Sequence, residues 1–156
     1  HALAQGLLLA DLKRGGLGSA LQELAYRTQE LFGVACRYAG PAAVPLADAA
    51  AAGQLYRIAQ EAAANAAKHS RARTIEIRLE NADDGLHLTV RDDGRGLAAR
   101  KTRKGGLGLD IMHYRAGLIG AALWIDSTRN RGTTVHCLVP LSAPRRRPKR
   151  ENQTRP

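Results

Sequence analysis

The sequence predicts an α/β (α+β) domain of two layers, in which about three helices cover one face of a mixed, mostly antiparallel sheet of about five strands. Two observations support this fold class. An alanine-rich run at residues 54–70 contains no Gly or Pro and places apolar residues at helical spacing. Directly after it, apolar and polar residues alternate from residue 74 to residue 90, which is typical of strands.

The chain before the alanine-rich helix contains one further helix and one further strand. Residues 1–16 hold leucines without a clean period, and we interpret them as the end of an upstream linker. Residues 19–32 repeat apolar side chains every three or four positions and are followed by Gly33, which predicts an amphipathic helix. Residues 34–38 alternate and predict a short strand, and a loop containing prolines follows.

The alternating stretch predicts a hairpin around a turn at residues 81–85, and its second strand ends at a carboxylate. Asp92 continues the parity of Leu88 and Val90, so its side chain should point to the buried face. A buried carboxylate is costly unless it is hydrogen-bonded or paired. Two partners stay open on this reasoning: a ligand that donates a hydrogen bond, or the backbone of the turn at residues 94–96.

The last part of the predicted domain begins with a mobile loop. Residues 97–106 show neither the helical nor the strand period and are rich in small and basic residues. Beyond this loop we expect a helix, a strand, a turn and a closing strand at residues 109–119, 123–125, 129–132 and 135–139. The folded domain should then span residues 17–140.

Composition restricts the class of protein. A chain of 156 residues suits one domain with a core, and no apolar run approaches the roughly 20 residues that span a bilayer. No segment resembling a secretory signal opens the chain, so we expect a cytoplasmic location. Cys36 and Cys137 stand in apolar, strand-like segments without metal-type spacing, and we interpret both as buried hydrophobic residues.

The net charge of +10 suggests nucleic-acid binding, but its location argues against that function. About half of the charge lies in residues 141–156, a basic tail interrupted by prolines that we expect to be disordered. The rest of the chain is mildly basic, and one Phe, one Trp and four Tyr offer few platforms for base stacking. We therefore expect no nucleic-acid partner, and a non-enzymatic basic binding module stays as an alternative function.

The alanine-rich helix carries the first candidate site. Glu61, Asn65 and Lys68 fall on one narrow stripe of this helix. The adjoining helix face is apolar, so the stripe lies at the border of the core, where pockets form. The alternative is a solvated helix edge with an incidental Glu and Lys.

The second candidate site is the glycine pair Gly106 and Gly108, which leads into the helix expected from Leu109. Backbone N–H groups converge at such a helix N-terminus and favour anions. The spacing matches neither a Walker loop nor the dinucleotide fingerprint. Two close glycines also fit an ordinary turn.

Four segments, in this order, resemble the conserved boxes of the ATPase superfamily that joins gyrase, Hsp90, histidine kinases and MutL. They are residues 61–69 (N box), 92–96 (G1 box), 106–109 (G2 box) and 132–133 (the last conserved element). Phrases at residues 55–61 and 108–116 further resemble sensor histidine kinases of the NarX/DesK-like subfamily. The likeness covers residues 17–140 and implies a Bergerat-type ATP-binding fold.

The resemblance implies a site for ATP and Mg²⁺, in which Glu61, Asn65 and Lys68 are the catalytic residues. Asn65 would coordinate Mg²⁺, and Glu61 would hold or polarise a metal-bound water or act in proton transfer. Lys68 would face the phosphates. Asp92 would accept a hydrogen bond from the adenine amino group, and Thr133 would help to fix the base. The other implied nucleotide contacts are His69, Gly94, Gly96, Gly106, Leu107, Gly108 and Leu109.

The resemblance also implies a function and partners. The chain would be the ATP-binding catalytic domain of a two-component sensor histidine kinase, which transfers the γ-phosphoryl to a histidine of its own dimerisation domain for relay to a response regulator. His1-Ala2 does not match the motif of that acceptor, so the dimerisation domain would lie outside this chain. The isolated domain should bind ATP with little autokinase activity, and the full-length protein should be a homodimer that could be membrane-anchored. An anti-sigma-type serine kinase of the same fold is the alternative enzyme.

Overall fold

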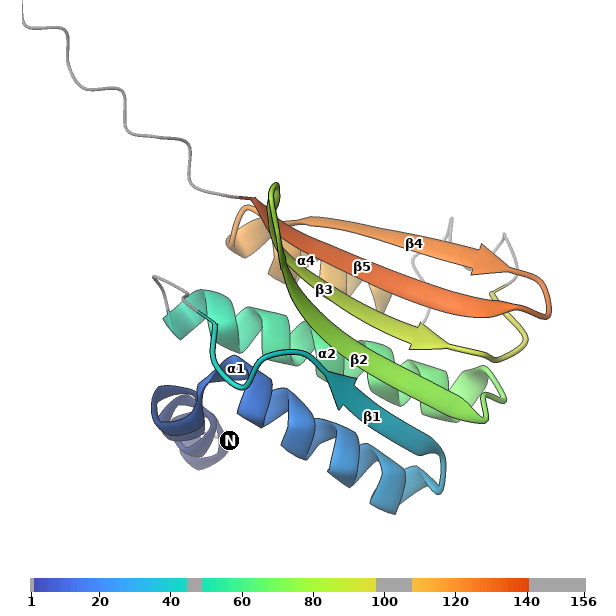
Figure 1. Ribbon diagram of the computed structural model, residues 1–156, viewed down its shortest axis with the longest axis horizontal. Helices are drawn as coiled ribbons and strands as arrows, with labels where there is room; N and C mark the ends of the chain where they lie inside the picture. The colour runs from blue at the N-terminus through green and yellow to red at the C-terminus, as the bar shows by residue number, and fades with distance from the viewer. Residues whose placement is uncertain (1, 45–48, 98–107, 141–156) are drawn as a thin grey trace, which may run out of the picture.

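The structure of the chain, a computed structural model, describes residues 2–44, 49–97 and 108–140 (Figure 1). Its elements in chain order are α1 (Ala2–Phe32), β1 (Ala35–Ala39), α2 (Ala49–His69), β2 (Thr74–Ala82), β3 (Gly85–Asp92), α4 (Leu109–Leu118), β4 (Ala122–Thr128) and β5 (Gly132–Pro140). The loop expected at residues 97–106 and the basic tail expected at residues 141–156 therefore lie almost entirely outside the described residues.

The five strands form one sheet in the order β1-β2-β3-β5-β4. β1 and β2 pair in parallel, joined by the crossover helix α2, and all other neighbours are antiparallel. The helices of the described residues, α1, α2 and α4, lie on one face of this sheet (Figure 1). The predicted two-layer architecture is confirmed.

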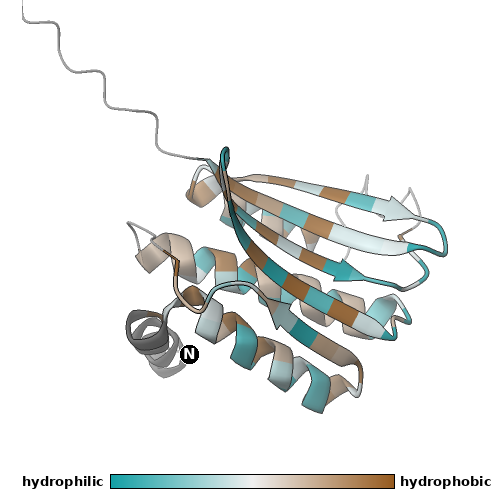
Figure 2. Ribbon diagram, viewed as in Figure 1, coloured by the Kyte–Doolittle hydropathy of each residue, from teal (hydrophilic) through white to brown (hydrophobic). Residues whose placement is uncertain are grey.

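The core lies between the helices and the inner face of the sheet. The helix α2 contributes the fully buried Leu55 and Ile58, and β2 and β3 contribute Ile77 and Leu88. Hydrophobic and hydrophilic residues alternate along the strands (Figure 2), because successive side chains of a strand point to opposite faces. Hydrophobic burial between these two layers is the main term that stabilises the fold.

The two cysteines are buried, as expected from their apolar surroundings. Burial raises the pKa of the Cys36 thiol and of the Cys137 thiol to about 11. Both therefore stay protonated at neutral pH and behave as small hydrophobic side chains.

The helices extend further than the sequence pattern indicated. The first helix starts at Ala2 and has a kink at Gly16, where φ is 78° and ψ is 173°. The helix α2 starts at Ala49, five residues before the predicted start, and passes through Gly53. Ala51 and Ala52 in this added turn are buried, so packing outweighs the low helix propensity of glycine. No helix in the described part of the chain is both long enough and apolar enough to cross a bilayer.

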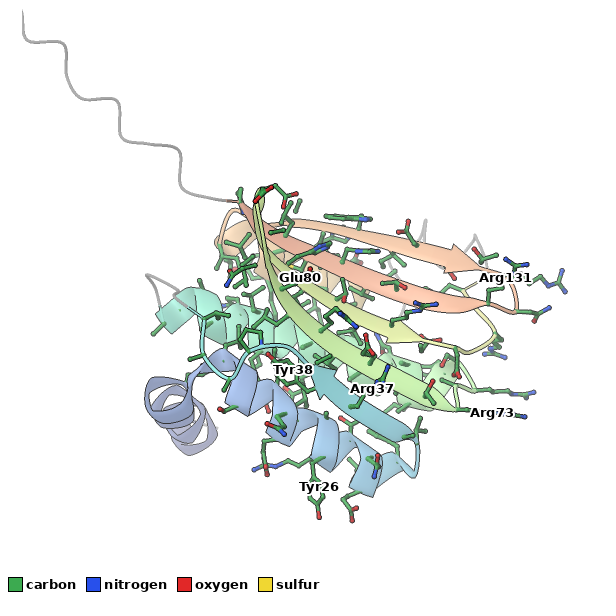
Figure 3. All side chains as sticks on the ribbon, viewed as in Figure 1. Tyr26, Arg37, Tyr38, Arg73, Glu80 and Arg131 are labelled. Atoms are coloured by element: carbon green, nitrogen blue, oxygen red, sulfur yellow. The ribbon has the colours of Figure 1, made fainter. Side chains whose placement is uncertain are left out.

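The outer face of the sheet is polar, and many of its groups pair with one another. Arg37 and Glu80 project from this side, away from the helices (Figure 3). Burial alone would raise the pKa of Glu76, but hydrogen bonds from Arg78 and Arg37 outweigh it and hold this pKa below its ordinary value. The Trp124 and His136 rings stack with centroids 4.8 Å apart.

Candidate functional site

A cavity of about 820 Å³ opens between α2, α4 and the ends of three strands, β3, β5 and β4. Its volume is in the range of small-molecule sites. Its walls come from the helices, the inner face of the sheet and two turns. The lining residues are Ala62, Asn65, Ala66, His69, Ser70, Val90, Asp92, Arg95, Gly96, Leu97, Leu109, Met112, Ile125, Ser127, Arg129, Asn130, Thr133 and Val135.

Asp92 is the acidic side chain of this cavity, and only 6% of its surface is exposed. Burial raises the pKa of its carboxyl, and hydrogen bonds from the backbone N–H groups of Gly94 and Thr133 partly offset that effect. The Gly94 N–H donates to Asp92 Oδ1 over 2.8 Å. The predicted inward orientation is confirmed. The carboxylate caps the turn that follows it and also faces the cavity, so the two partners left open by the sequence are compatible.

The turn after Asp92 is locked against the C-terminal end of α2. The Arg95 N–H donates to Ser70 O over 2.8 Å. A Cβ on Gly94 would lie 2.3 Å from Ser70 O, so this close approach of two backbones requires glycine. The Ser70 hydroxyl lies 2.6 Å from Ala66 O and is also close enough to Asp92 to bond to its carboxylate. It has one proton and donates it to one of these two acceptors at a time.

Thr133 and Ser127 continue the polar row that Asp92 begins. Strand register places Asp92 opposite Thr133 and Thr133 opposite Ser127. The Ser127 and Thr133 hydroxyl oxygens lie 3.0 Å apart. The Leu97 N–H donates to Ser127 Oγ over 2.7 Å. Three neighbouring strands thus present three polar side chains at one end of the sheet, the end where Arg73 and Arg131 project in Figure 3.

The predicted helix stripe separates into three positions. Asn65 lines the cavity, as does the exposed His69. Glu61 lies beside the start of α4. A Cβ built on Gly108 would be only 2.1 Å from Glu61 Oε1. The Lys68 ammonium lies over the Phe32 ring, 5.8 Å from its centroid, on the α1 side of α2. The structure brings Asn65 and His69 to the cavity but directs Lys68 away from it.

The N-terminus of α4 borders the same cavity through Leu109. Gly108 precedes it in the left-handed conformation, with φ of 70°, and no side chain of the described residues caps this helix end. Within the described ranges, the first N–H groups of α4 are thus not bonded by a capping side chain. Gly106 and Leu107 lie outside the described residues.

Several lining residues were not predicted from the sequence, of which Ser127 is the most informative. Ser127 follows Leu123 and Ile125 at alternate positions of β4, so its parity already indicated an inward-facing hydroxyl. The same signal had identified Asp92. Arg95, Arg129 and Asn130 come from turns, where no periodic pattern gives the direction of a side chain.

The family described as "Histidine kinase-, DNA gyrase B-, and HSP90-like ATPase" matches residues 50–143, which is more than half of the chain. This span includes both sides of the cavity, from α2 to β5. The chain belongs to this family. The predicted ATPase domain of the histidine kinase type is therefore confirmed at the level of the family, and ATP is the nucleotide that the family name implies.

Sequence relatives include a signal transduction histidine-protein kinase/phosphatase and a sensor protein. The chain is 36% identical over 91 residues to the signal transduction histidine-protein kinase/phosphatase DegS of Bacillus subtilis, covering 56% of this chain and 24% of that protein. It is 36% identical over 88 residues to the sensor protein VraS of Staphylococcus aureus, covering 56% of this chain and 25% of that protein. The chain thus spans about a quarter of the length of these relatives.

Solved structures agree on the fold. The histidine kinase domain of the blue-light activated histidine kinase EL346 of Erythrobacter litoralis superposes with a TM-score of 0.70 at 24% identity, over 86% of this chain and 70% of that one. The ATP binding domain of PrrB from Mycobacterium tuberculosis superposes with a TM-score of 0.67 at 17% identity, over 81% of this chain and 94% of that one.

Proposed function

We propose that this chain is the ATP-binding catalytic domain of a sensor histidine kinase, which binds Mg-ATP in the cavity and supplies the γ-phosphoryl to a histidine of a separate dimerisation domain. The observation that supports this most strongly is the position of Asp92. Its buried carboxylate lines the cavity, and a carboxylate has more acceptor sites than the turn occupies. The amino group of a ligand in the cavity would bond to a remaining acceptor site of this carboxylate.

The base of the nucleotide would lie against the polar row at the end of the sheet. Asp92 would accept a hydrogen bond from the adenine amino group, and Thr133 would bond to a ring nitrogen, directly or through water. Val90, Ile125 and Met112 offer apolar surface for the faces of the ring. The few polar groups would fix the orientation of the base, and the apolar walls would hold most of its surface.

The phosphates would extend toward α2 and α4. The uncapped N-terminus of α4 favours an anion, and Gly106, Leu107 and Gly108 would surround it as in the family motif. His69 and Asn65 line the same cavity from α2. Leu109, which borders the cavity at the start of α4, would close the site on that side.

The donor set fits Mg²⁺ held largely by the nucleotide. No group of three His, Cys, Asp or Glu side chains that could hold a metal occurs in the described parts of the chain. Mg²⁺ at such sites keeps several waters and takes one or two protein ligands beside the phosphates. The Asn65 amide oxygen would be that protein ligand, and Glu61 would act through water. The metal, when bound, would neutralise part of the phosphate charge.

Catalysis in this arrangement would consist mainly of positioning. The bond between the γ-phosphorus and the bridging oxygen breaks, a bond from phosphorus to the acceptor histidine nitrogen forms, and ADP leaves. The cavity residues would hold ATP in line for that transfer. Glu61, next to the start of α4, would polarise a water or take part in proton transfer.

The partners in this proposal lie outside the chain. They are the protein's own dimerisation domain, which would make the full-length protein a homodimer, and a response regulator that receives the phosphoryl group. We place the domain in the cytoplasm, where ATP is available. The isolated chain should bind ATP and show little autokinase activity, because the acceptor histidine is absent.

A nucleotide titration tests the proposal. The chain should bind a fluorescent ATP analogue in the presence of Mg²⁺, and Asp92→Asn should weaken this binding about tenfold or more, because a charge-assisted hydrogen bond is lost. Asp93→Asn is the matched control, since the Asp93 carboxylate bonds to Thr74 and Arg73 and does not line the cavity. Wild-type affinity in Asp92→Asn would contradict the adenine assignment.

Transfer is tested separately by mixing the chain with the dimerisation domain of its own full-length protein and with ATP labelled at the γ-phosphate. Acid-labile phosphohistidine on the added domain is the expected product. Phosphate that survives acid would favour a serine kinase instead.

A further inference from the structure

We infer that Ser127 is a positioning residue of the nucleotide site, which holds the Thr133 hydroxyl as a hydrogen-bond donor toward the base. This inference rests on the proposed function. Ser127 belongs to none of the four family boxes found in the sequence, and it reaches the site only through the register of β4 with β5.

The hydrogen bonds of Ser127 determine its role. Its oxygen accepts from the Leu97 N–H over 2.7 Å, which leaves one lone pair and one proton. Two acceptors are within reach of that proton: Thr133 Oγ1 at 3.0 Å and Gly132 O at 3.5 Å. The shorter contact is in the normal range for a hydroxyl, and the longer one is at the limit. The 3.0 Å contact allows either hydroxyl to donate, and we assign the Ser127 proton to it because it is the shorter of the two.

The direction of this bond determines whether the Thr133 hydroxyl can donate a hydrogen bond to a ligand. A threonine hydroxyl that accepts from Ser127 keeps its own proton, which is free to point into the cavity. Thr133 then donates, and Asp92, one strand away on the same rung, accepts. Adenine presents the complementary pair, an amino donor beside a ring-nitrogen acceptor. Without Ser127, the Thr133 hydroxyl would lose this orientation.

Ser127 also fixes the wall opposite the helices. The Leu97 N–H bonded to Ser127 belongs to the segment that leaves the glycine turn after Asp92. A Cβ on Gly96 would lie 3.2 Å from Ser127 Oγ and 2.5 Å from Thr128 O, so this segment packs closely on β4. One hydroxyl thus connects the turn, β4 and β5 at the base end of the cavity.

A double-mutant cycle on Mg-ATP-analogue binding tests the inference. Ser127→Ala should weaken binding about tenfold, the effect of one or two lost hydrogen bonds. Thr133→Val should weaken it by a similar factor. If Ser127 acts through Thr133, adding Ser127→Ala to Thr133→Val should cost no more than about twofold further. A purely structural loss would instead multiply the two effects.

Controls separate this inference from the proposed function. Thr128→Ala removes a hydroxyl from the next residue of β4, on the opposite face, and should leave binding unchanged. Thermal unfolding without nucleotide checks that each variant folds, and Ser127→Cys, a weaker donor of similar shape, repeats the cycle if Ser127→Ala does not fold. Wild-type affinity in Ser127→Ala, or independent effects in the cycle, would overturn the inference. A wild-type chain that binds no ATP analogue would overturn the proposed function itself.

Discussion

The two ends of the cavity are built differently. At the base end, Asp92, Thr133 and Ser127 lie on one rung of three adjacent strands and are joined by hydrogen bonds. The metal end is the part of the cavity next to Asn65 of α2. There the side chain of Glu61 lies against the start of α4, and that of Lys68 lies against α1. Strand register fixes both the face and the height of a side chain. A helical stripe fixes only an arc of the helix surface, and packing against the neighbouring helices determines the direction of each side chain.

Between Asn65 and Lys68 of α2, the larger expected effect on nucleotide binding is that of Asn65, at the metal end of the cavity. Asn65→Ala should remove the Mg²⁺ dependence of triphosphate binding and weaken Mg-ATP binding about tenfold, because the proposed protein ligand of the ion is lost. Titration of the fluorescent analogue with and without Mg²⁺ measures this. An unchanged metal requirement would place the ion elsewhere. A Mg²⁺-free affinity equal to that of the wild type would show that the base end remains intact.

The two adjacent carboxylates at the base end should respond to pH in opposite directions. Burial raises the pKa of Asp92, so its favourable contribution to folding is complete below the ordinary value of 3.8 and is lost as pH rises through the raised pKa. Hydrogen bonds, first from the Thr74 backbone N–H, lower the pKa of Asp93, so its contribution is complete above 3.8 and is lost as pH falls through the lowered pKa.

Thermal unfolding of the two Asn variants between acid and neutral pH measures this contrast. Relative to the wild type, Asp92→Asn should gain stability as pH rises, because the wild type then carries a buried charge. Asp93→Asn should lose stability over the same rise. Differences of the same sign for both variants would contradict the assignment of one inward and one outward carboxylate.

The smallest expected effect concerns Lys68. Lys68→Ala should change nucleotide affinity by less than about twofold and should lower stability slightly, since an exposed cation–π contact contributes about 0.5–1 kcal/mol. The same titration and a thermal unfolding curve measure both quantities. A tenfold loss of affinity would show that the Lys68 ammonium reaches the phosphates, as the family motif implies.

The fold and the base end were largely predictable because both follow from period-two alternation. The inward direction of Asp92 came from its parity with Val90, and the hairpin gave most of the sheet. The parallel pairing of β1 with β2 could not come from alternation alone, since it depends on the crossover through α2. The early start of α2 was also not predictable from the pattern, because the burial of Ala51 and Ala52 compensates for the low helix propensity of Gly53.

The metal end was less predictable for a physical reason. The spacing of Glu61, Asn65 and Lys68 placed all three on one stripe, but long side chains on a helix border pack against whatever neighbour is nearest. Phe32 at the end of α1 provides that neighbour for Lys68, and its position depends on how α1 packs on α2. Local spacing contains no information on that packing.

The most direct test of the account is the choice between ATP and inosine triphosphate, which carries a carbonyl where adenine carries the amino group. The wild-type chain should bind ATP at least about tenfold more tightly, because the Asp92 carboxylate accepts from an amino group and repels a carbonyl. Asp92→Asn should narrow or reverse this preference, since its amide can donate. Equal affinities of the wild type for both nucleotides would contradict the placement of the base at Asp92.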